Sequence, residues 1–116
     1  MKKKIDTLIN KNKIRENENL IIRYIPEIKF MIGFEHNHPH HNLDVWNHTL
    51  KVLDGVKNED LELKMAALLH DIGKPFSYQD EEVRHFHGHP EVSKNISEKI
   101  LRRLNYDEEF INDVCY

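Results

Sequence analysis

Residues 67–76 read ALLHDIGKPF, an apolar run at helical spacing that ends on a histidine and an aspartate side by side. His70 and Asp71 follow residues that are suited to burial, and a polar group buried without a partner costs roughly 2–7 kcal/mol. Gly73 is a good helix terminator at this point. The stretch therefore predicts a helix that ends here and carries two polar side chains toward the interior of the protein.

The helix that leads into this doublet is expected to cover residues 58–72. Its core stripe consists of Leu61, Met65, Leu68, Leu69 and Ile72. Ala66 and Ala67 lie one turn before the doublet, and their small side chains should let another helix come close. The doublet is thus expected at a crowded helix contact.

The preceding helix is expected from Leu43 to about Asp54, with Asn42 as its N-cap and Gly55 as its end. Its inner face is predicted to contain Val45, His48, Thr49 and Val52, with Leu50 and Leu53 beside them. One further histidine, His48, should therefore point inward from a helix next to the doublet.

The remaining segments are also helical in pattern. Residues 1–34 predict one or two helices that Pro26 should bend or break, with apolar positions at Leu20, Ile21, Tyr24, Ile25, Ile28, Met31 and Ile32. Pro90 suits the first position of a later helix, whose stripe is Val92, Ile96, Ile100 and Leu104. Asp107 should cap a last helical segment. The expected fold class is all-α, one helical bundle in which an N-terminal helical segment (1–34) precedes the core (35–116).

Composition sets further limits on the class of protein. The chain has 116 residues, 39% hydrophobic and 32% charged, which suits one globular domain. Its net charge of −3 and isoelectric point of about 6.3 argue against a general attraction to nucleic acid, although a local basic patch would be compatible with them. One cysteine, Cys115, excludes an internal disulfide. With no apolar signal core and no run of roughly 20 apolar residues, a cytoplasmic protein without a membrane segment is expected.

Histidine is over-represented, with nine residues. Two clusters, His36, His38, His40 and His41 and then His85, His87 and His89, lie outside the apolar patterns that hold His48 and His70. The first cluster falls in the loop EHNHPHHN, where only His41, just before a helix, is expected near a pocket. Because histidine is the commonest metal ligand, this distribution directs the search for a site.

A shared metal ion would resolve the burial of the His-Asp doublet. Adjacent helical residues point about 100° apart, so His70 and Asp71 cannot stack, but both can reach one point off the helix end. A divalent ion there accepts imidazole and carboxylate at about 2.0–2.2 Å, and His48 is the natural third ligand. Zinc, iron, nickel and manganese all suit such ligands. The alternative is a core histidine bonded to a backbone carbonyl, with Asp71 holding its tautomer.

Three motifs in order, DVWNHTL, ALLHDIGKP and HFHGHPEVS, resemble the HD superfamily of metal-dependent phosphohydrolases. The HDIGK form and the HFxGHxxxS pattern are most similar to the HD domain attached to bacterial tRNA nucleotidyltransferases and poly(A) polymerases. The similarity extends over about residues 25–104. It implies an HD-domain-like helical bundle with its core in residues 35–116.

The resemblance also implies roles for individual residues. It makes metal ligands of His48, His70 and Asp71, and gives His89 either a second ion or the substrate phosphate. Lys74 and His85 would be further groups at the phosphate, although Lys74 could also be a solvated lysine after a helix. The cofactor would be a divalent transition metal ion (Zn, Fe, Ni or Mn) or Mg. The family's last aspartate ligand would fall after residue 116 in this pattern, and Asp113 is a poor substitute.

The function that follows is hydrolysis of a phosphoester in a nucleotide or an RNA end, as a phosphatase, 2′,3′-cyclic phosphodiesterase or nucleotidase. The ion would polarise a phosphoryl oxygen and activate water. One alternative is a non-catalytic helical module that helps a nucleotidyltransferase to hold tRNA, using the basic residues Lys99, Arg102 and Arg103. Another is an HD scaffold that has lost its chemistry.

Overall fold

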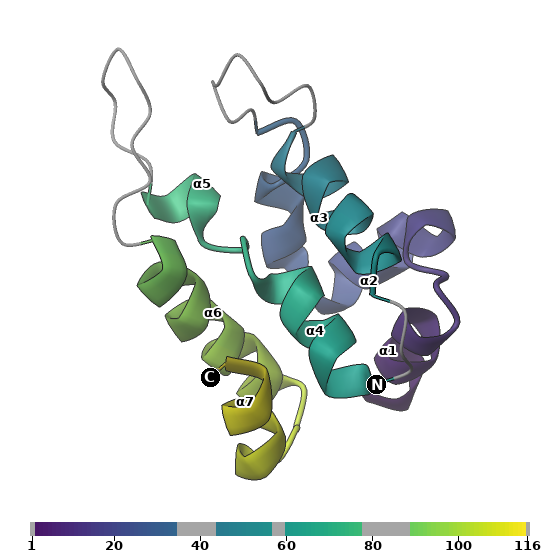
Figure 1. Cartoon of the computed structure of the whole chain (residues 1–116), viewed down its shortest axis with the longest axis vertical. Helices are drawn as coiled ribbons and strands as arrows, with labels where there is room; N and C mark the ends of the chain where they lie inside the picture. Colours follow the sequence, from purple (N-terminus) through teal and green to yellow (C-terminus); the bar gives the residue numbers. More distant parts are fainter. Residues whose placement is uncertain (1, 35–43, 57–59, 78–88, 116) are drawn as a thin grey trace.

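The computed structural model describes residues 2–34, 44–56, 60–77 and 89–115, and these ranges contain helices without a β-strand (Figure 1). The prediction of an all-α fold is confirmed. The helical elements, with η for 3₁₀, are α1 (Lys2–Asn10), η1 (Arg15–Asn17), α2 (Glu18–Tyr24), η2 (Pro26–Phe30), α3 (Val45–Asp54), α4 (Leu61–Leu69), α5 (Lys74–Ser77), α6 (His89–Arg103) and α7 (Glu108–Cys115). Within the described ranges, no helix combines the length and the apolar character that crossing a bilayer requires.

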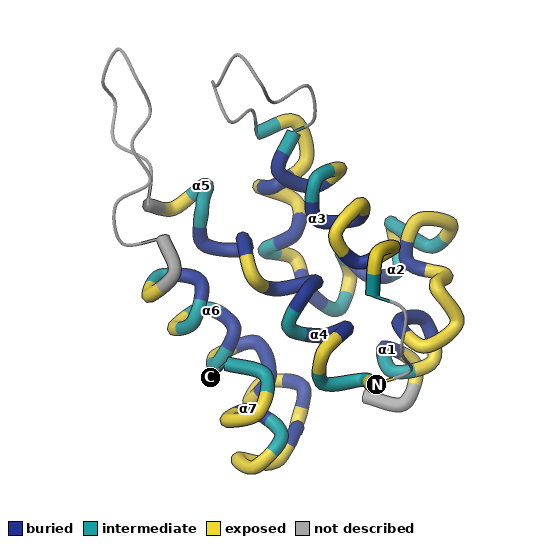
Figure 2. Tube along the Cα trace, viewed as in Figure 1, coloured by how far each residue is buried: buried dark blue, intermediate teal, exposed yellow. Residues whose placement is uncertain are grey.

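Helix α4 lies at the centre of the bundle. It packs against α3 and α1 on one side and against α7 on the other, while the short helix α5 packs against α6 (Figure 1). Buried positions occur along the N-terminal helices as well as along α3, α4 and α6 (Figure 2). One cluster of buried apolar side chains joins these segments and includes Ile5, Ile21, Ile28, Trp46, Leu68, Ile100 and Ile111. Burying each such side chain contributes about 1.5–3 kcal/mol, so the segments before and after α4 stabilise one another.

The break at Pro26 is confirmed, because α2 ends at Tyr24 and η2 begins at the proline. The cap of α3, in contrast, differs from the prediction. Asp44, not Asn42, is the N-cap: its Oδ1 accepts the N–H of Asn47 at 2.6 Å, and its Oδ2 accepts the N–H of Gly33 at 2.6 Å. One carboxylate thereby fixes the start of α3 against the end of the N-terminal segment.

The buried face of α3 is rotated from the predicted one. Trp46, Leu50 and Leu53 are buried, whereas Val52 is 37% exposed, so the prediction that Val52 faces inward was wrong. At 100° per residue, the buried arc is centred on the Trp46 and Leu53 side, and Val52 and His48 lie at its rim. His48 is therefore half-buried instead of enclosed in the core.

Helix α4 is shorter than predicted. It covers Leu61–Leu69, with Asp60 as N-cap accepting the N–H groups of Glu62 at 2.9 Å and Leu63 at 3.3 Å. Residues 70–73 form a turn outside the helix, so the prediction of a helix through Ile72 was wrong. The physical reason is that the chain has to bend here to bring α5 against α6.

Gly73 also has a different role from the predicted one. A Cβ built on it would lie 2.5 Å from the backbone nitrogen of Ser93, and the Gly73 N–H donates to Ser93 Oγ at 2.8 Å. Gly73 is thus required by a close contact with α6 and does not terminate a helix. Helix α6 itself begins at His89, one residue before Pro90, and Asp107 caps α7 as predicted by accepting the N–H of Phe110 at 2.8 Å.

Candidate metal centre

His70 follows directly after α4, and its ring is oriented by the backbone of that helix. Its Nδ1 lies 2.6 Å from the carbonyl oxygen of Ala67. Because a carbonyl can only accept, the hydrogen is on Nδ1, and Nε2 is the nitrogen that faces the neighbouring groups. Metal-ligating histidines are commonly held in this way, with the second nitrogen donating to a backbone carbonyl.

Asp71 is buried beside two basic side chains. Asp71 is only 4% exposed. Its Oδ2 lies 3.0 Å from His70 Nε2 and 3.4 Å from Lys74 Nζ. Burial by itself would raise the pKa of Asp71, but the hydrogen bond and charge of His70, together with Lys74, lower that pKa to about 2. In turn the hydrogen bond that His70 donates to Asp71 raises the pKa of His70. The carboxylate is therefore charged and oriented at neutral pH.

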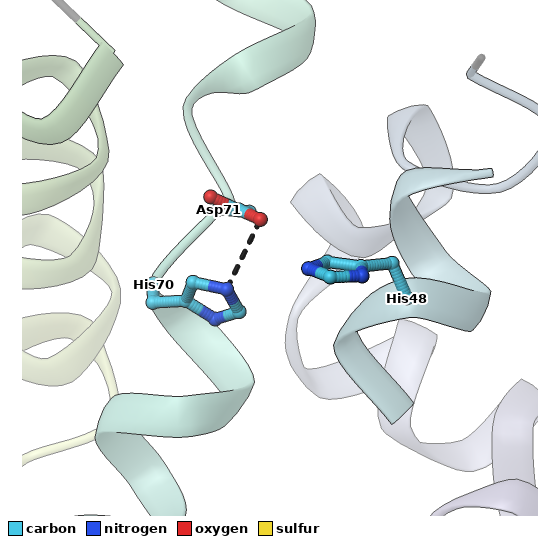
Figure 3. Close-up of side chains that lie close together, drawn as sticks. All are labelled: His48, His70 and Asp71. Atoms are coloured by element: carbon cyan, nitrogen blue, oxygen red, sulfur yellow. Dashed lines mark ion pairs between the residues drawn. The ribbon is translucent and has the colours of Figure 1, made fainter. Parts of the chain in front are cut away.

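His48 reaches the same place from α3. Figure 3 shows its ring pointing across the gap between α3 and α4 toward the His70–Asp71 pair. The rings of His48 and His70 have their centroids 6.1 Å apart, and one ligand atom from each of the three residues lies within 4.8 Å of the others. Among the described residues, His48, His70 and Asp71 form the one group of three or more potential metal ligands whose ligand atoms come this close together.

The donor set fits a divalent ion. Two ligands of a tetrahedral ion at 2.0–2.2 Å lie about 3.4 Å apart, and His70 Nε2 and Asp71 Oδ2 are close to this spacing at 3.0 Å. The half-buried His48 imidazole, whose ligand atom lies within 4.8 Å of the other two, would have to move by roughly 1.4 Å at most to reach this spacing. Two imidazoles and one carboxylate are compatible with Zn, Fe, Ni or Mn.

Lys74, at the start of α5, belongs to this centre. Its side chain is 14% exposed and its ammonium forms an ion pair with Asp71. The alternative of a solvated lysine is therefore wrong, since the side chain is mostly enclosed and directed at the doublet.

Several predicted site residues cannot be placed. His85, predicted at the phosphate, and His41, predicted near the pocket, lie outside the described residues, and so do His36, His38, His40 and His87, which were not predicted as site residues. For His89 the structure describes only the backbone, at the N-terminus of α6. Their proposed roles stay predictions.

Asp113 does not approach the three converging residues. It lies on α7 beside Glu62, at the opposite end of α4 from His70. The pKa of Glu62 is raised first by partial desolvation and next by the negative charge of Asp113. The nine residues of α4 at 1.5 Å each separate the two ends by about 12 Å. Asp113 is therefore excluded as the fourth ligand.

A cavity of about 210 Å³ between α4, α6 and α7 borders His70 on the side away from α3. Its polar lining includes Ser93, Lys94, Ser97 and Cys115. Of these only Ser93 was part of a motif, the last letter of HFxGHxxxS, and the motif by itself did not reveal its bond to Gly73. Lys94, Ser97 and Cys115 carried no signal in the sequence, because their proximity arises only when α6 and α7 pack.

The predicted basic patch is largely neutralised. Arg102 pairs with Glu108 at 2.9 Å and with Glu98 at 3.4 Å, and both terminal nitrogens of Arg103 lie 2.9 Å from Glu27. Paired guanidinium groups attract phosphate less strongly than free ones. Two of the three predicted basic residues are thus paired with carboxylates, while Lys99 on the same helix is exposed.

Comparison with known proteins gives a consistent result. Residues 40–116 match the family model described as HD domain. A CC-adding tRNA nucleotidyltransferase of Thermus thermophilus is 33% identical over 110 residues, 89% of this chain and 25% of that protein. An A-adding tRNA nucleotidyltransferase of Deinococcus radiodurans is 37% identical over 87 residues, 69% of this chain and 20% of that protein.

A multifunctional CCA protein of Nitrosospira multiformis is 30% identical over 95 residues, 79% of this chain and 23% of that protein. The chain therefore spans about a quarter, or less, of the length of these curated relatives. No solved structure matches it.

Proposed function

Because the chain belongs to the HD domain family, we propose that it is a metal-dependent phosphohydrolase acting on a phosphoester of a nucleotide or an RNA end. The observation that carries the proposal is the convergence of His48, His70 and Asp71 from two neighbouring helices. A buried carboxylate between basic side chains is an arrangement typical of functional sites.

The proposed ligands of the ion are His48, His70 and Asp71, with His89 as a candidate for a second ion. When bound, a divalent ion at this place supplies a Lewis acid that polarises a phosphoryl oxygen and activates water. The Ala67 carbonyl holds His70 through Nδ1, so that Nε2 faces Asp71 and the proposed position of the ion. Lys74, His85 and His89 are proposed to hold the phosphate, where fixed positive charge stabilises the charge that develops in the transition state.

The choice of a nucleotide or RNA end as substrate rests on the likeness to tRNA nucleotidyltransferases. Phosphatase, 2′,3′-cyclic phosphodiesterase and nucleotidase activities all fit these residues. The proposed location is the cytoplasm, and the proposed division is an N-terminal helical segment (1–34) followed by the HD core (35–116).

The test combines metal content with hydrolysis of a 2′,3′-cyclic nucleotide. Purified protein should contain about one transition metal ion per chain, and hydrolysis should be lost on chelation and in His70→Ala. Asp113→Asn, at the other end of α4, is the matched control and should keep full activity. Hydrolysis that persists in both the chelated protein and His70→Ala would remove the proposal.

The non-catalytic tRNA module is the competing function. It would show salt-dependent RNA binding that survives removal of the metal. The pairing of Arg102 and Arg103 with carboxylates argues against it, because paired guanidinium groups attract phosphate less strongly than free ones.

A further inference from the structure

The ammonium of Lys74 lies where a bound cation would contribute its charge. Lys74 Nζ and His70 Nε2 approach the same oxygen of Asp71, at 3.4 and 3.0 Å. A divalent ion that is bound by Asp71 has to share this carboxylate with both of them. We propose that Lys74 is an exchangeable counter-ion, which balances Asp71 when the ion is absent and is displaced toward the substrate phosphate when the ion binds. This inference rests on the metal site of the proposed function, but not on hydrolysis.

The burial of Asp71 gives the reason for a counter-ion. A carboxylate that is 4% exposed and has no balancing charge would be strongly destabilising. Lys74 supplies that charge from within the chain, three residues away and directly after the turn that Gly73 fixes against Ser93. The folded protein therefore does not require the metal in order to bury Asp71.

Simultaneous binding of both cations at the carboxylate is unfavourable. An ion at about 2.1 Å from the Asp71 oxygen would bring two positive charges close to Nζ in a poorly hydrated place, where repulsion is stronger than in bulk water. Lysine has a flexible four-carbon stem, so Nζ can move outward while α5 stays in position. The Lys74 side chain is 14% exposed, so part of it already lies at the surface.

Displacement has a consequence for substrate binding. An ammonium released from Asp71 is available to an anion beside the ion, so metal loading and phosphate binding should strengthen each other. Such coupling is reciprocal by thermodynamic necessity. Lys74 would thus favour phosphate binding to the loaded site over the empty one.

The experiment measures Mn²⁺ affinity, by the paramagnetic resonance signal of the free ion, for the full chain and four variants. Lys74→Met removes the competing charge and should bind Mn²⁺ about fivefold to tenfold more tightly than the wild type. Lys74→Arg keeps the charge and should stay within about twofold of the wild type. Lys51→Met, an exposed lysine on α3, is the control for loss of net charge and should also stay near the wild type.

Lys74→Gln is the second variant if Lys74→Met fails to fold, since an amide can still donate to Asp71 without carrying charge. It should show the same tighter binding. Inorganic phosphate provides the second readout: the wild type should bind it about tenfold more tightly with Mn²⁺ than without, and this difference should shrink in Lys74→Met or Lys74→Gln.

The outcomes separate the two proposals. Wild-type protein that binds no Mn²⁺ overturns the metal site and the exchange together. Normal wild-type binding with unchanged or weaker binding in Lys74→Met and Lys74→Gln overturns only the exchange. The expected pattern of Mn²⁺ and phosphate binding without any phosphoester hydrolysis supports the exchange and removes only the hydrolase proposal.

Discussion

The two ends of α4 both carry carboxylates, but the surroundings make them different groups. At the N-terminal end, Glu62 lies beside Asp113 at the surface, and partial desolvation together with that neighbour raises the pKa of Glu62. At the C-terminal end, Asp71 is buried between His70 and Lys74, which lower its pKa to about 2. The two carboxylates at the N-terminal end of α4 repel each other, whereas the carboxylate of Asp71 at the C-terminal end is held in its charged form.

The difference shows why counting acidic residues does not locate a metal centre. Asp113 is an aspartate on the last described helix, yet it lies beside Glu62, at the opposite end of α4 from His70. Asp71 is the better candidate because it is buried and offers a ligand atom within 4.8 Å of one from His48 and one from His70. Each of the following predictions tests one part of this contrast, from the largest expected effect to the smallest.

The largest effect is expected when the charge at the buried end is removed. Asp71→Asn should lower the affinity for Zn²⁺ or Mn²⁺ by at least about 100-fold, because it removes an anionic ligand and the partner of His70. Asp113→Asn should leave the affinity unchanged. Metal titration of both variants checks this, with circular dichroism to confirm folding. An equal loss of metal affinity in Asp71→Asn and Asp113→Asn would contradict the difference between the two ends of α4.

The next effect concerns the turn that positions Asp71. Gly73→Ala places a Cβ 2.5 Å from the backbone of Ser93, and we expect a loss of about 2 kcal/mol or more in the free energy of unfolding. Gly55→Ala is the matched control, since its Cβ would meet the Val52 carbonyl at 3.3 Å and the Lys51 carbonyl at 3.8 Å; it should change stability by less than about 0.5 kcal/mol. Urea denaturation measures both. If Gly73→Ala left the free energy of unfolding unchanged, α6 would be able to move away from the added Cβ, and the close contact would not be required.

A smaller effect is expected at the N-cap of α4. Asp60→Ala removes the oxygen that accepts two backbone N–H groups and should cost about 1 kcal/mol. Asp60→Asn keeps an acceptor and should be nearly neutral. Thermal denaturation distinguishes the two, and metal affinity should be unaffected in both because the cap is at the other end of the helix.

The smallest effect concerns the pH dependence of Glu62. Its folded-state pKa is raised, so its contribution to stability is complete below the unfolded pKa of about 4.3 and is lost as the pH rises through the folded value. Glu62→Gln abolishes this loss, and its melting temperature relative to the wild type should therefore rise between about pH 4 and pH 7. If the difference in melting temperature between Glu62→Gln and the wild type did not change between these pH values, the repulsion from Asp113 would be contradicted.

Much of the helical framework could be predicted from local patterns. Pro26, Gly55 and Asp107 mark element boundaries because proline and capping residues act on their immediate neighbours. The errors arose where tertiary packing decides. Residues 70–73 lie outside the helix because the chain has to bend for α5 to pack against α6. Val52 is exposed because α3 packs through the face that carries Trp46 and Leu53 and not through the face that carries Val52.

The candidate site divides in the same way. The sequence by itself determined that His48, His70 and Asp71 are the residues able to share an ion, since their chemistry and their place at the edge of apolar stripes are local properties. Only the tertiary structure decided that Lys74 joins them and that Asp113 does not. The reason is that helical periodicity gives directions about one axis, whereas the meeting of charges from different elements depends on how those axes pack.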